Sequence, residues 1–77
     1  MNNKIIAEFM INEILEKGYV YQEYLVHDIQ EKFGDDFVYI NENGNLAISK
    51  KVLNEFKKLK EQNNIEWDRS ERSWVNN

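Results

Sequence analysis

The chain has 77 residues, of which 42% are hydrophobic and 13% aromatic, and a formal net charge of −4 at pH 7. This length predicts a single domain over residues 1–77, and the absence of cysteine excludes a disulfide framework and a thiolate metal site. No stretch approaches the ~20 apolar residues that span a bilayer, and the N-terminus lacks the apolar run of a signal peptide. We therefore expect a cytoplasmic protein without a membrane segment.

Charge is unevenly distributed along the chain. Residues 1–48 carry three lysines and nine acids, a net charge of −6, whereas residues 49–77 carry seven basic residues and five acids, a net charge of +2. Strong nucleic-acid binders are usually basic overall. The basic C-terminal part is therefore a weak indication of an anionic partner.

The first predicted element is a helix over residues 3–17. An asparagine at position 2 or 3 can cap its start, and Gly18 suits the position after its end. Apolar residues at helical spacing predict a buried stripe of Ala7, Met10, Ile11, Ile14 and Leu15.

Ile5 and Phe9 fall on the opposite side of this helix. Two interpretations stay open. The second apolar face packs against the C-terminal residues of the same chain, or it forms an interface with another chain. In the second case Ile5 and Phe9 would pair two copies into a symmetric homodimer.

Residues 19–23, "YVYQE", predict a short strand that leads into a second helix over residues 23–33. The buried stripe of that helix comprises Leu25, Val26, Ile29 and Phe33, and Gly34 ends it. The following residues 37–40, "FVYI", have strand composition, and Asn43-Gly44 is a strong hairpin signal. We expect a small extended excursion over residues 35–48, with Leu46 and Ile48 returning to the core.

Ser49 is the expected cap of a third helix over residues 49–62. Its buried stripe comprises Val52, Leu53, Phe56 and Leu59. The opposite side carries a polar surface that we call the lysine face, made of Lys50, Lys51, Asn54, Lys57 and Lys58.

The last predicted element is a hairpin over residues 65–75. If Ser70-Glu71 is its turn, Trp67 lies across from Trp74, and Arg69 lies across from Arg72. A cross-strand aromatic pair of this kind stabilises a hairpin by about 0.5–1 kcal/mol. A longer loop over residues 68–72 is the alternative, because the turn has no glycine.

This order of elements predicts an α+β fold with winged-helix-like architecture: three helices, a short strand after the first helix, and a C-terminal β-hairpin wing. The short strand would pair with the terminal hairpin. The run "ISKKVLNEFKKLKEQNNIEW" resembles the recognition helix and first wing strand of winged-helix proteins. "YVYQE" and "FGDDFVYINENGNLAISKKVL" resemble a small family of uncharacterised bacterial proteins, a domain of unknown function of which some members are carried on mobile gene cassettes.

The resemblance implies a fold and no activity. Helix-turn-helix proteins join their second and third helices by three or four residues, whereas here Gly34 and Ser49 are far apart. The excursion between them would either block the third helix from a DNA groove or add a contact.

We expect no enzymatic activity, no cofactor, no metal site and no small-molecule substrate. His27 is the only histidine and falls on the outer side of its helix, and no triad spacing is present. Zinc would need more histidine or cysteine ligands, and the spacing around Gly44 does not match a calcium loop. We expect Tyr19, Tyr21, Tyr24 and Tyr39 to lie at the rim of the core, because the acids around them disfavour a platform for single-stranded nucleic acid.

Two functions remain. The first is a winged-helix scaffold for protein–protein interaction, with a protein partner or a second copy docking at Ile5 and Phe9. The alternative is a transcriptional regulator that binds duplex DNA. Its contacts would come from the lysine face, which suits phosphates and, through Asn54, adenine, and from Arg69 and Arg72 at the wing tip.

Overall fold

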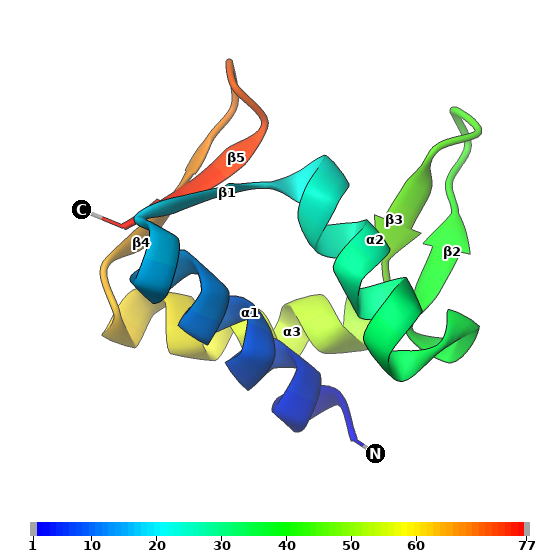
Figure 1. Cartoon of the computed structure of the whole chain (residues 1–77), viewed down its shortest axis with the longest axis horizontal. Helices are drawn as coiled ribbons and strands as arrows, with labels where there is room; N and C mark the ends of the chain where they lie inside the picture. The colour runs from blue at the N-terminus through cyan, green and yellow to red at the C-terminus, as the bar shows by residue number, and fades with distance from the viewer. Residues whose placement is uncertain (1, 77) are drawn as a thin grey trace.

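The computed structural model describes residues 2–76 of the chain. In chain order the elements are α1 (Asn3–Lys17), β1 (Tyr19–Tyr21), α2 (Gln22–Phe33), the 3₁₀ helix η1 (Asp35–Phe37), β2 (Val38–Ile40), β3 (Leu46–Ile48), α3 (Lys50–Gln62), β4 (Ile65–Asp68) and β5 (Ser73–Asn76). The predicted α+β class is confirmed, with three helices, a short strand after the first helix and a C-terminal hairpin (Figure 1).

The described strands form two separate antiparallel sheets. The larger has the order β1-β5-β4, and the smaller is the β2–β3 ribbon. The predicted pairing of the first strand with the terminal hairpin is therefore confirmed. The two hairpins rise on opposite sides of the molecule, and their tips point in the same direction, away from α3 (Figure 1).

Side chains and backbone groups at the helix ends explain where the helices begin and stop. The Asn2 side chain accepts a hydrogen bond from the Ile5 N–H at 2.9 Å at the start of α1. Gly18 ends that helix with φ of 84°, a left-handed conformation that suits glycine. Ser49 caps α3 by accepting from the Lys51 N–H at 3.3 Å. All three positions were predicted as caps from the sequence.

Helices α1 and α3 cross against each other and bury the centre of the molecule (Figure 1). Most residues of the predicted buried stripes are buried, but on α1 the set of buried residues differs from the predicted one. Ile6 is fully buried, whereas Leu15 is exposed at the end of the helix. The prediction for Leu15 was wrong, and Ile6, which the predicted stripe did not include, is buried because α1 packs against α3, α2 and the strands β1 and β5.

The second face of α1 is covered in part: Phe9 packs against α2, whereas Ile5 stays 48% exposed. The cover over Phe9 comes from α2, where the first of the two interpretations expected C-terminal residues. The rings of Phe9 and Phe33 meet edge to face, with centroids 5.4 Å apart. The Lys32 ammonium lies 5.1 Å from the centroid of the Phe9 ring, within reach of a cation–π contact. Phe9 is thereby half-buried within its own chain.

The excursion between α2 and α3 contains the predicted hairpin with one change. Phe37 belongs to η1 and not to a strand, and its carbonyl accepts a hydrogen bond from the Ser49 N–H at 2.8 Å. Ile48 returns to the core and Leu46 packs at its margin, as predicted. The ribbon projects away from α3 (Figure 1), so it does not cover the outer side of that helix.

The terminal hairpin is attached to the core through Trp74. Trp67 lies directly across from Trp74, as predicted, and their ring centroids are 4.6 Å apart. Trp74 packs on the buried Phe56 of α3 with centroids 4.8 Å apart. We expected both rings, paired across the hairpin, to cover the core, and this was wrong for Trp67, which is 37% exposed.

The turn of this hairpin is organised by Asp68. Its Oδ1 atom accepts from the Ser70 hydroxyl at 2.8 Å, from the Ser70 N–H at 3.1 Å and from the Glu71 N–H at 3.2 Å. The hydrogen bond from the Ser70 side chain is the main reason that the pKa of Asp68 lies below its ordinary value. These bonds explain how a four-residue connection closes without glycine.

Candidate functional site

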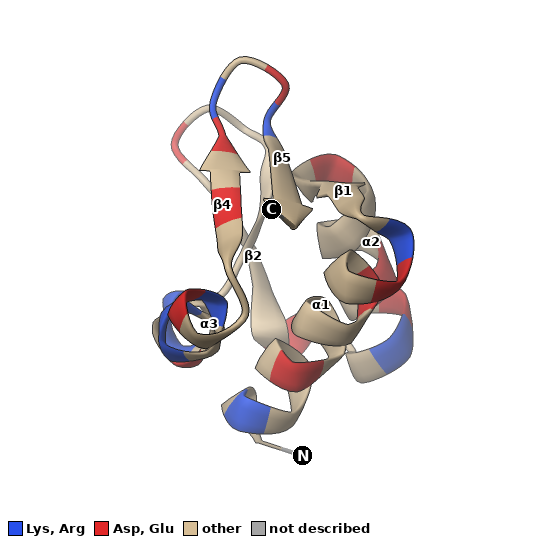
Figure 2. Ribbon diagram, turned by 90° about the vertical axis from the view of Figure 1, so that its left-hand side faces the viewer, with Lys and Arg blue, Asp and Glu red and all other residues tan. Residues whose placement is uncertain are grey.

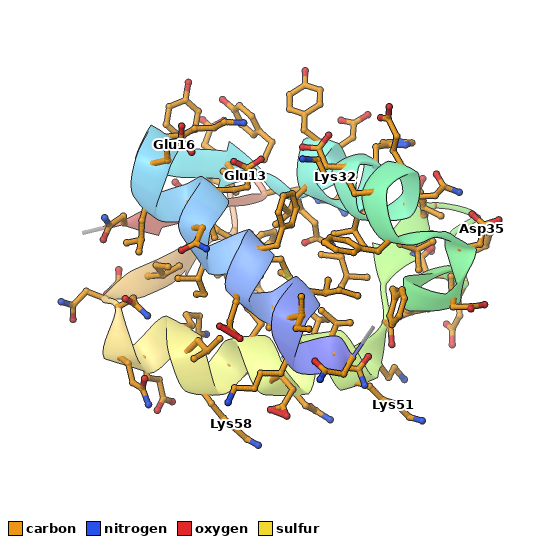
Figure 3. All side chains as sticks on the ribbon, turned by 60° about the horizontal axis from the view of Figure 1, so that its bottom comes forward. Glu13, Glu16, Lys32, Asp35, Lys51 and Lys58 are labelled. Carbon is orange, nitrogen blue, oxygen red and sulfur yellow. The ribbon has the colours of Figure 1, made fainter. Side chains whose placement is uncertain are left out.

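The lysine face lies on the outer side of α3. All five of its residues are exposed, and Lys51 and Lys58 point away from the body of the molecule (Figure 3). Their positions follow from the helix, because Val52 and Phe56 on the other side are fully buried. The sequence located this face correctly.

The charge of the lysine face is partly compensated. The Lys58 Nζ atom lies 3.1 Å from Glu55 Oε2, within the same helix. Lys60, which is near this face in sequence, lies 5.6 Å from the centroid of the Trp74 ring and is drawn toward the hairpin. Figure 2 shows both acidic and basic segments on α3. The face is therefore a mixed surface with a small excess of positive charge.

The predicted basic residues of the wing lie elsewhere. Arg69 and Arg72 belong to the connection between β4 and β5, which forms the tip of the terminal hairpin. This tip and α3 lie at opposite ends of the molecule (Figures 1 and 2). The structure thus separates Arg69 and Arg72 from the lysine face, because the hairpin rises away from the helix.

The two predicted interface residues on α1 differ in exposure. Ile5 is 48% exposed. Phe9 is half-buried against Phe33, as described above. Ile5 is therefore the more exposed of the two residues proposed for a homodimer.

A third surface was not expected from the sequence, and we call its residues Tyr19, Tyr21 and Tyr24 the tyrosine surface. Their rings meet edge to face in a row, with centroids 5.6 Å apart for Tyr19 and Tyr21 and 5.9 Å apart for Tyr21 and Tyr24. They are 55%, 37% and 65% exposed, respectively. The expectation that the tyrosines form the rim of the core was therefore wrong for these three residues, and also for Tyr39, which is 41% exposed.

The position of β1 in the sheet explains this exposure. Side chains alternate between the two faces of a strand, and Val20 is buried against the helices. Tyr19 and Tyr21 must therefore stand on the outer face of the sheet, and Tyr24 follows them in the first turn of α2. The only sequence signal for this exposure is the alternation of residue types in "YVY". Three residues are too few to distinguish a strand with one exposed face from a strand that is buried on both faces.

Charged residues of both signs border the tyrosine surface, with Lys17 and Asp28 on one side and Glu71 and Arg72 on the other. The register of the sheet places Glu66 of β4 in line with Val75 and Tyr19, and Asp68 in line with Ser73 and Tyr21. A shallow hollow of about 340 Å³ adjoins the tyrosines and is lined by Lys17, Tyr19, Val20, Tyr21, Tyr24 and Asp28. Lys17 lies 3.7 Å from Glu13 in an exposed ion pair.

A second, larger groove of about 510 Å³ lies between the two hairpins. Its walls come from the tip of β4–β5, with Glu71 and Arg72, and from the β2–β3 ribbon, with Asn45 and Leu46. The start of α2 completes it and contributes Tyr21, Tyr24 and His27. Tyr21 and Tyr24 therefore separate two concave surfaces.

Within residues 2–76 no three histidine, aspartate or glutamate side chains come close enough to hold a metal ion. No helix in this part of the chain has the length and apolar character needed to cross a bilayer.

The order of the elements and the exposed side chains together define a small α+β protein with three helices, a β-hairpin at its C-terminal end and an exposed aromatic surface. The chain belongs to the family of unknown function DUF6953, whose family model matches residues 2–76. No curated protein and no solved structure matches it. The resemblance to a domain of unknown function is confirmed at this level, whereas bacterial origin and carriage on gene cassettes remain predictions.

Proposed function

We propose that this protein is a small non-enzymatic binding module, a winged-helix scaffold that binds another protein through the tyrosine surface. The observation that carries the proposal is the row of three exposed, mutually packed tyrosines between two concave surfaces. Tyrosine is among the residue types that contribute most binding energy at protein interfaces. Rings that already support one another also lose little conformational freedom when a partner covers them.

The charges around the site favour a protein partner over a nucleic acid. Asp28 and Lys17 line the hollow with opposite charges, and Lys17 lies 3.7 Å from Glu13. Glu66 and Asp68 share the sheet face of the tyrosines, so acids outnumber bases around the site. Phosphate groups would be repelled there, whereas a protein partner can supply complementary side chains.

Duplex DNA binding is the second candidate, and the exposure of the whole lysine face favours it. The separation of Arg69 and Arg72 from that face limits the number of phosphates that one duplex could meet on both surfaces. We expect a weak interaction with a modest salt dependence, about three to four counterions released.

The test is a capture experiment with three forms of the full chain at matched loading. The wild type is compared with Tyr19→Ser/Tyr24→Ser and with Lys51→Glu/Lys58→Glu, each immobilised through the same terminal tag. The substituted side chains are all exposed, so thermal melting should coincide for the three forms. We expect the lysine variant to retain the protein that the wild type captures from cells of its source, and the tyrosine variant to lose it.

Gel shift of mixed duplex DNA at ~50 mM salt distinguishes the second candidate, because phosphate contacts are strongest at low salt. A shift that the lysine variant abolishes and the tyrosine variant retains would assign function to the lysine face. Capture that survives in the tyrosine variant would overturn the proposed function.

A further inference from the structure

The backbone of β1 has one edge that no described strand covers. In the sheet, β1 pairs with β5 on one side and is the outermost strand on the other. The Asn76 N–H donates to the Gly18 carbonyl at 2.9 Å, and the Gln22 N–H donates to the Arg72 carbonyl at 3.0 Å. These two bonds fix which residues of β1 face β5.

Residues of an antiparallel pair alternate between those that bond to the partner strand and those whose backbone groups point away from it. Gly18 and Gln22 bond toward β5, so Val20, midway between them, does so too, and it lies across from Trp74. Tyr19 and Tyr21 therefore direct their backbone groups to the free edge. The Tyr21 carbonyl begins α2 as the N-cap position, which leaves the Tyr19 N–H, the Tyr19 carbonyl and the Tyr21 N–H for another strand.

The hollow of about 340 Å³ lies at this edge, because it is lined by Tyr19 and Tyr21, whose backbone groups point to the edge, and by the buried Val20 between them. Lys17 at the end of α1 and Tyr24 and Asp28 on one side of α2 form its walls. An extended segment that enters the hollow would meet unpaired backbone groups on one side and tyrosine rings on another. Strand addition to a sheet edge is a recurring mode of peptide recognition.

The charge of the surrounding elements selects the occupant. The last two turns of α1 carry Glu13, Glu16 and Lys17, and Figure 3 shows both glutamates on the side of the molecule away from Lys51 and Lys58. Lys17 lines the hollow and lies 3.7 Å from Glu13, so these two charges offset each other and the negative charge of Glu16 and Asp28 remains. Asp28 lies in the hollow itself. An arginine fits this environment best, since its planar guanidinium stacks on aromatic rings and pairs with carboxylates.

We propose that the free edge of β1 binds an extended, arginine-bearing segment of a partner protein, which adds as a fourth strand to the sheet β1-β5-β4 while its arginines contact the tyrosine surface and Asp28. The proposal rests on the proposed function and names the chemistry of the partner. A second copy of the chain is a poorer occupant, because its basic excess lies on a helix and its own β1 strand, Tyr19–Tyr21, carries no arginine.

The test uses the isotope-labelled full chain and the peptide acetyl-Arg-Val-Arg-Val-Arg-amide, followed by amide chemical shifts. We expect the largest shifts at the Tyr19 and Tyr21 amides, as these gain hydrogen bonds. The peptide with glutamate in place of arginine should not bind. Tyr24→Ser should weaken binding about two- to fivefold, the factor for one exposed cation–π contact.

Matched controls come from the other hairpin. Tyr39 on β2 is also an exposed tyrosine, and Glu42 is an exposed acid in the β2–β3 connection. Tyr39→Ser and Glu42→Lys should bind the peptide as the wild type does, whereas Asp28→Lys should weaken binding about fivefold. If the control variants lose as much peptide affinity as Tyr24→Ser and Asp28→Lys, the binding reflects the overall charge of the protein and not this edge. That result would overturn the proposal.

Three other outcomes also overturn strand addition. They are equal binding of the glutamate peptide, shifts centred away from Tyr19 and Tyr21, and shifts that appear in the wild type with rising protein concentration alone, which would indicate self-pairing. If strand addition fails while capture of a protein still depends on Tyr19 and Tyr24, the proposed function stands. If capture is independent of these tyrosines, both proposals fail.

Discussion

The lysine face and the tyrosine surface differ in how the chain builds them. The lysine face is a property of one amphipathic helix, and every residue of it can be read from 13 consecutive positions of α3. The tyrosine surface depends on β1, on α2 and on a pairing with β5, more than 50 positions away in sequence. A local charge pattern thus identifies an exposed face, whereas the surface better suited to a partner appears only when distant segments pair.

Both surfaces depend on the same core contact, which gives the largest expected effect. Phe56 of α3 is fully buried and packs on Trp74 of β5, so it connects the helix that carries the lysines to the sheet that carries the tyrosines. Phe56→Ala should lower the free energy of unfolding by about 3–5 kcal/mol. Urea unfolding measures this loss, and both surfaces should be lost in one transition.

Trp67→Ala is the matched control for Phe56→Ala. Its ring is 37% exposed, so we expect a loss below about 2 kcal/mol, less than for a fully buried aromatic ring. Equal losses in the two variants would contradict the assignment of Phe56 and Trp74 as the contact that joins the two surfaces.

The predictions that succeeded rest on short-range signals. Asn2, Gly18 and Ser49 act through hydrogen bonds or backbone angles within a few residues, so their roles are visible locally. The Trp67–Trp74 register follows from the short connection between two strands. The α+β layout with a C-terminal hairpin followed from the order of such elements.

The predictions that failed depend on contacts between distant segments. The burial of Ile6 and the exposure of Leu15 are decided by where α2 and α3 lie against α1. Phe9 meets Phe33 because α2 folds back over α1, which no periodicity within α1 encodes. The exposure of the tyrosines has the same origin, since three residues of strand carry too little pattern to show which face is covered.

The next prediction concerns the second face of α1, which competes with the tyrosine surface as an interface. Phe9→Glu should lower the free energy of unfolding by about 2 kcal/mol or more, because it removes a packed aromatic pair and places a charge beside Phe33. Ile5→Glu should change it by less than about 0.5 kcal/mol, since Ile5 is 48% exposed. Chemical denaturation compares the two.

Ile5→Glu is consequently the better test of the predicted homodimer. Sedimentation at tens of micromolar should show a dimer in the wild type that Ile5→Glu dissociates without unfolding. A wild type that sediments as a monomer at that concentration removes the homodimer, and leaves the tyrosine surface as the proposed interface.

A smaller effect is expected at the lysine face. Lys51→Glu/Lys58→Glu should change the free energy of unfolding by less than about 0.5 kcal/mol, because both side chains are exposed and project into solvent. Thermal melting provides the measurement. A larger loss would mean that the lysines stabilise the fold, and the variant could then no longer serve to separate the two surfaces in binding experiments.

The smallest effect is a pH dependence at the hairpin tip. The pKa of Asp68 is lowered from its ordinary value of 3.8, chiefly by the Ser70 hydrogen bond. Since the folded form holds the carboxylate ionised, its contribution is present above this ordinary value and is lost as pH falls through the lowered pKa. The Ser70 and Glu71 amide shifts should titrate with a midpoint below 3.8, and Asp68→Asn should abolish this titration. A midpoint at or above the ordinary value would contradict the hydrogen bonds that close the turn.

Hydrogen exchange of the full chain, alone and with its captured protein partner, tests the central claim most directly. The Tyr19 and Tyr21 amides lie at the free edge of β1 and should exchange rapidly in the unbound chain. The account predicts that the partner slows amide exchange across residues 19–24 and leaves the exchange rates of the α3 amides unchanged. Protection confined to residues 50–62, with residues 19–24 exchanging as in the unbound chain, would contradict it.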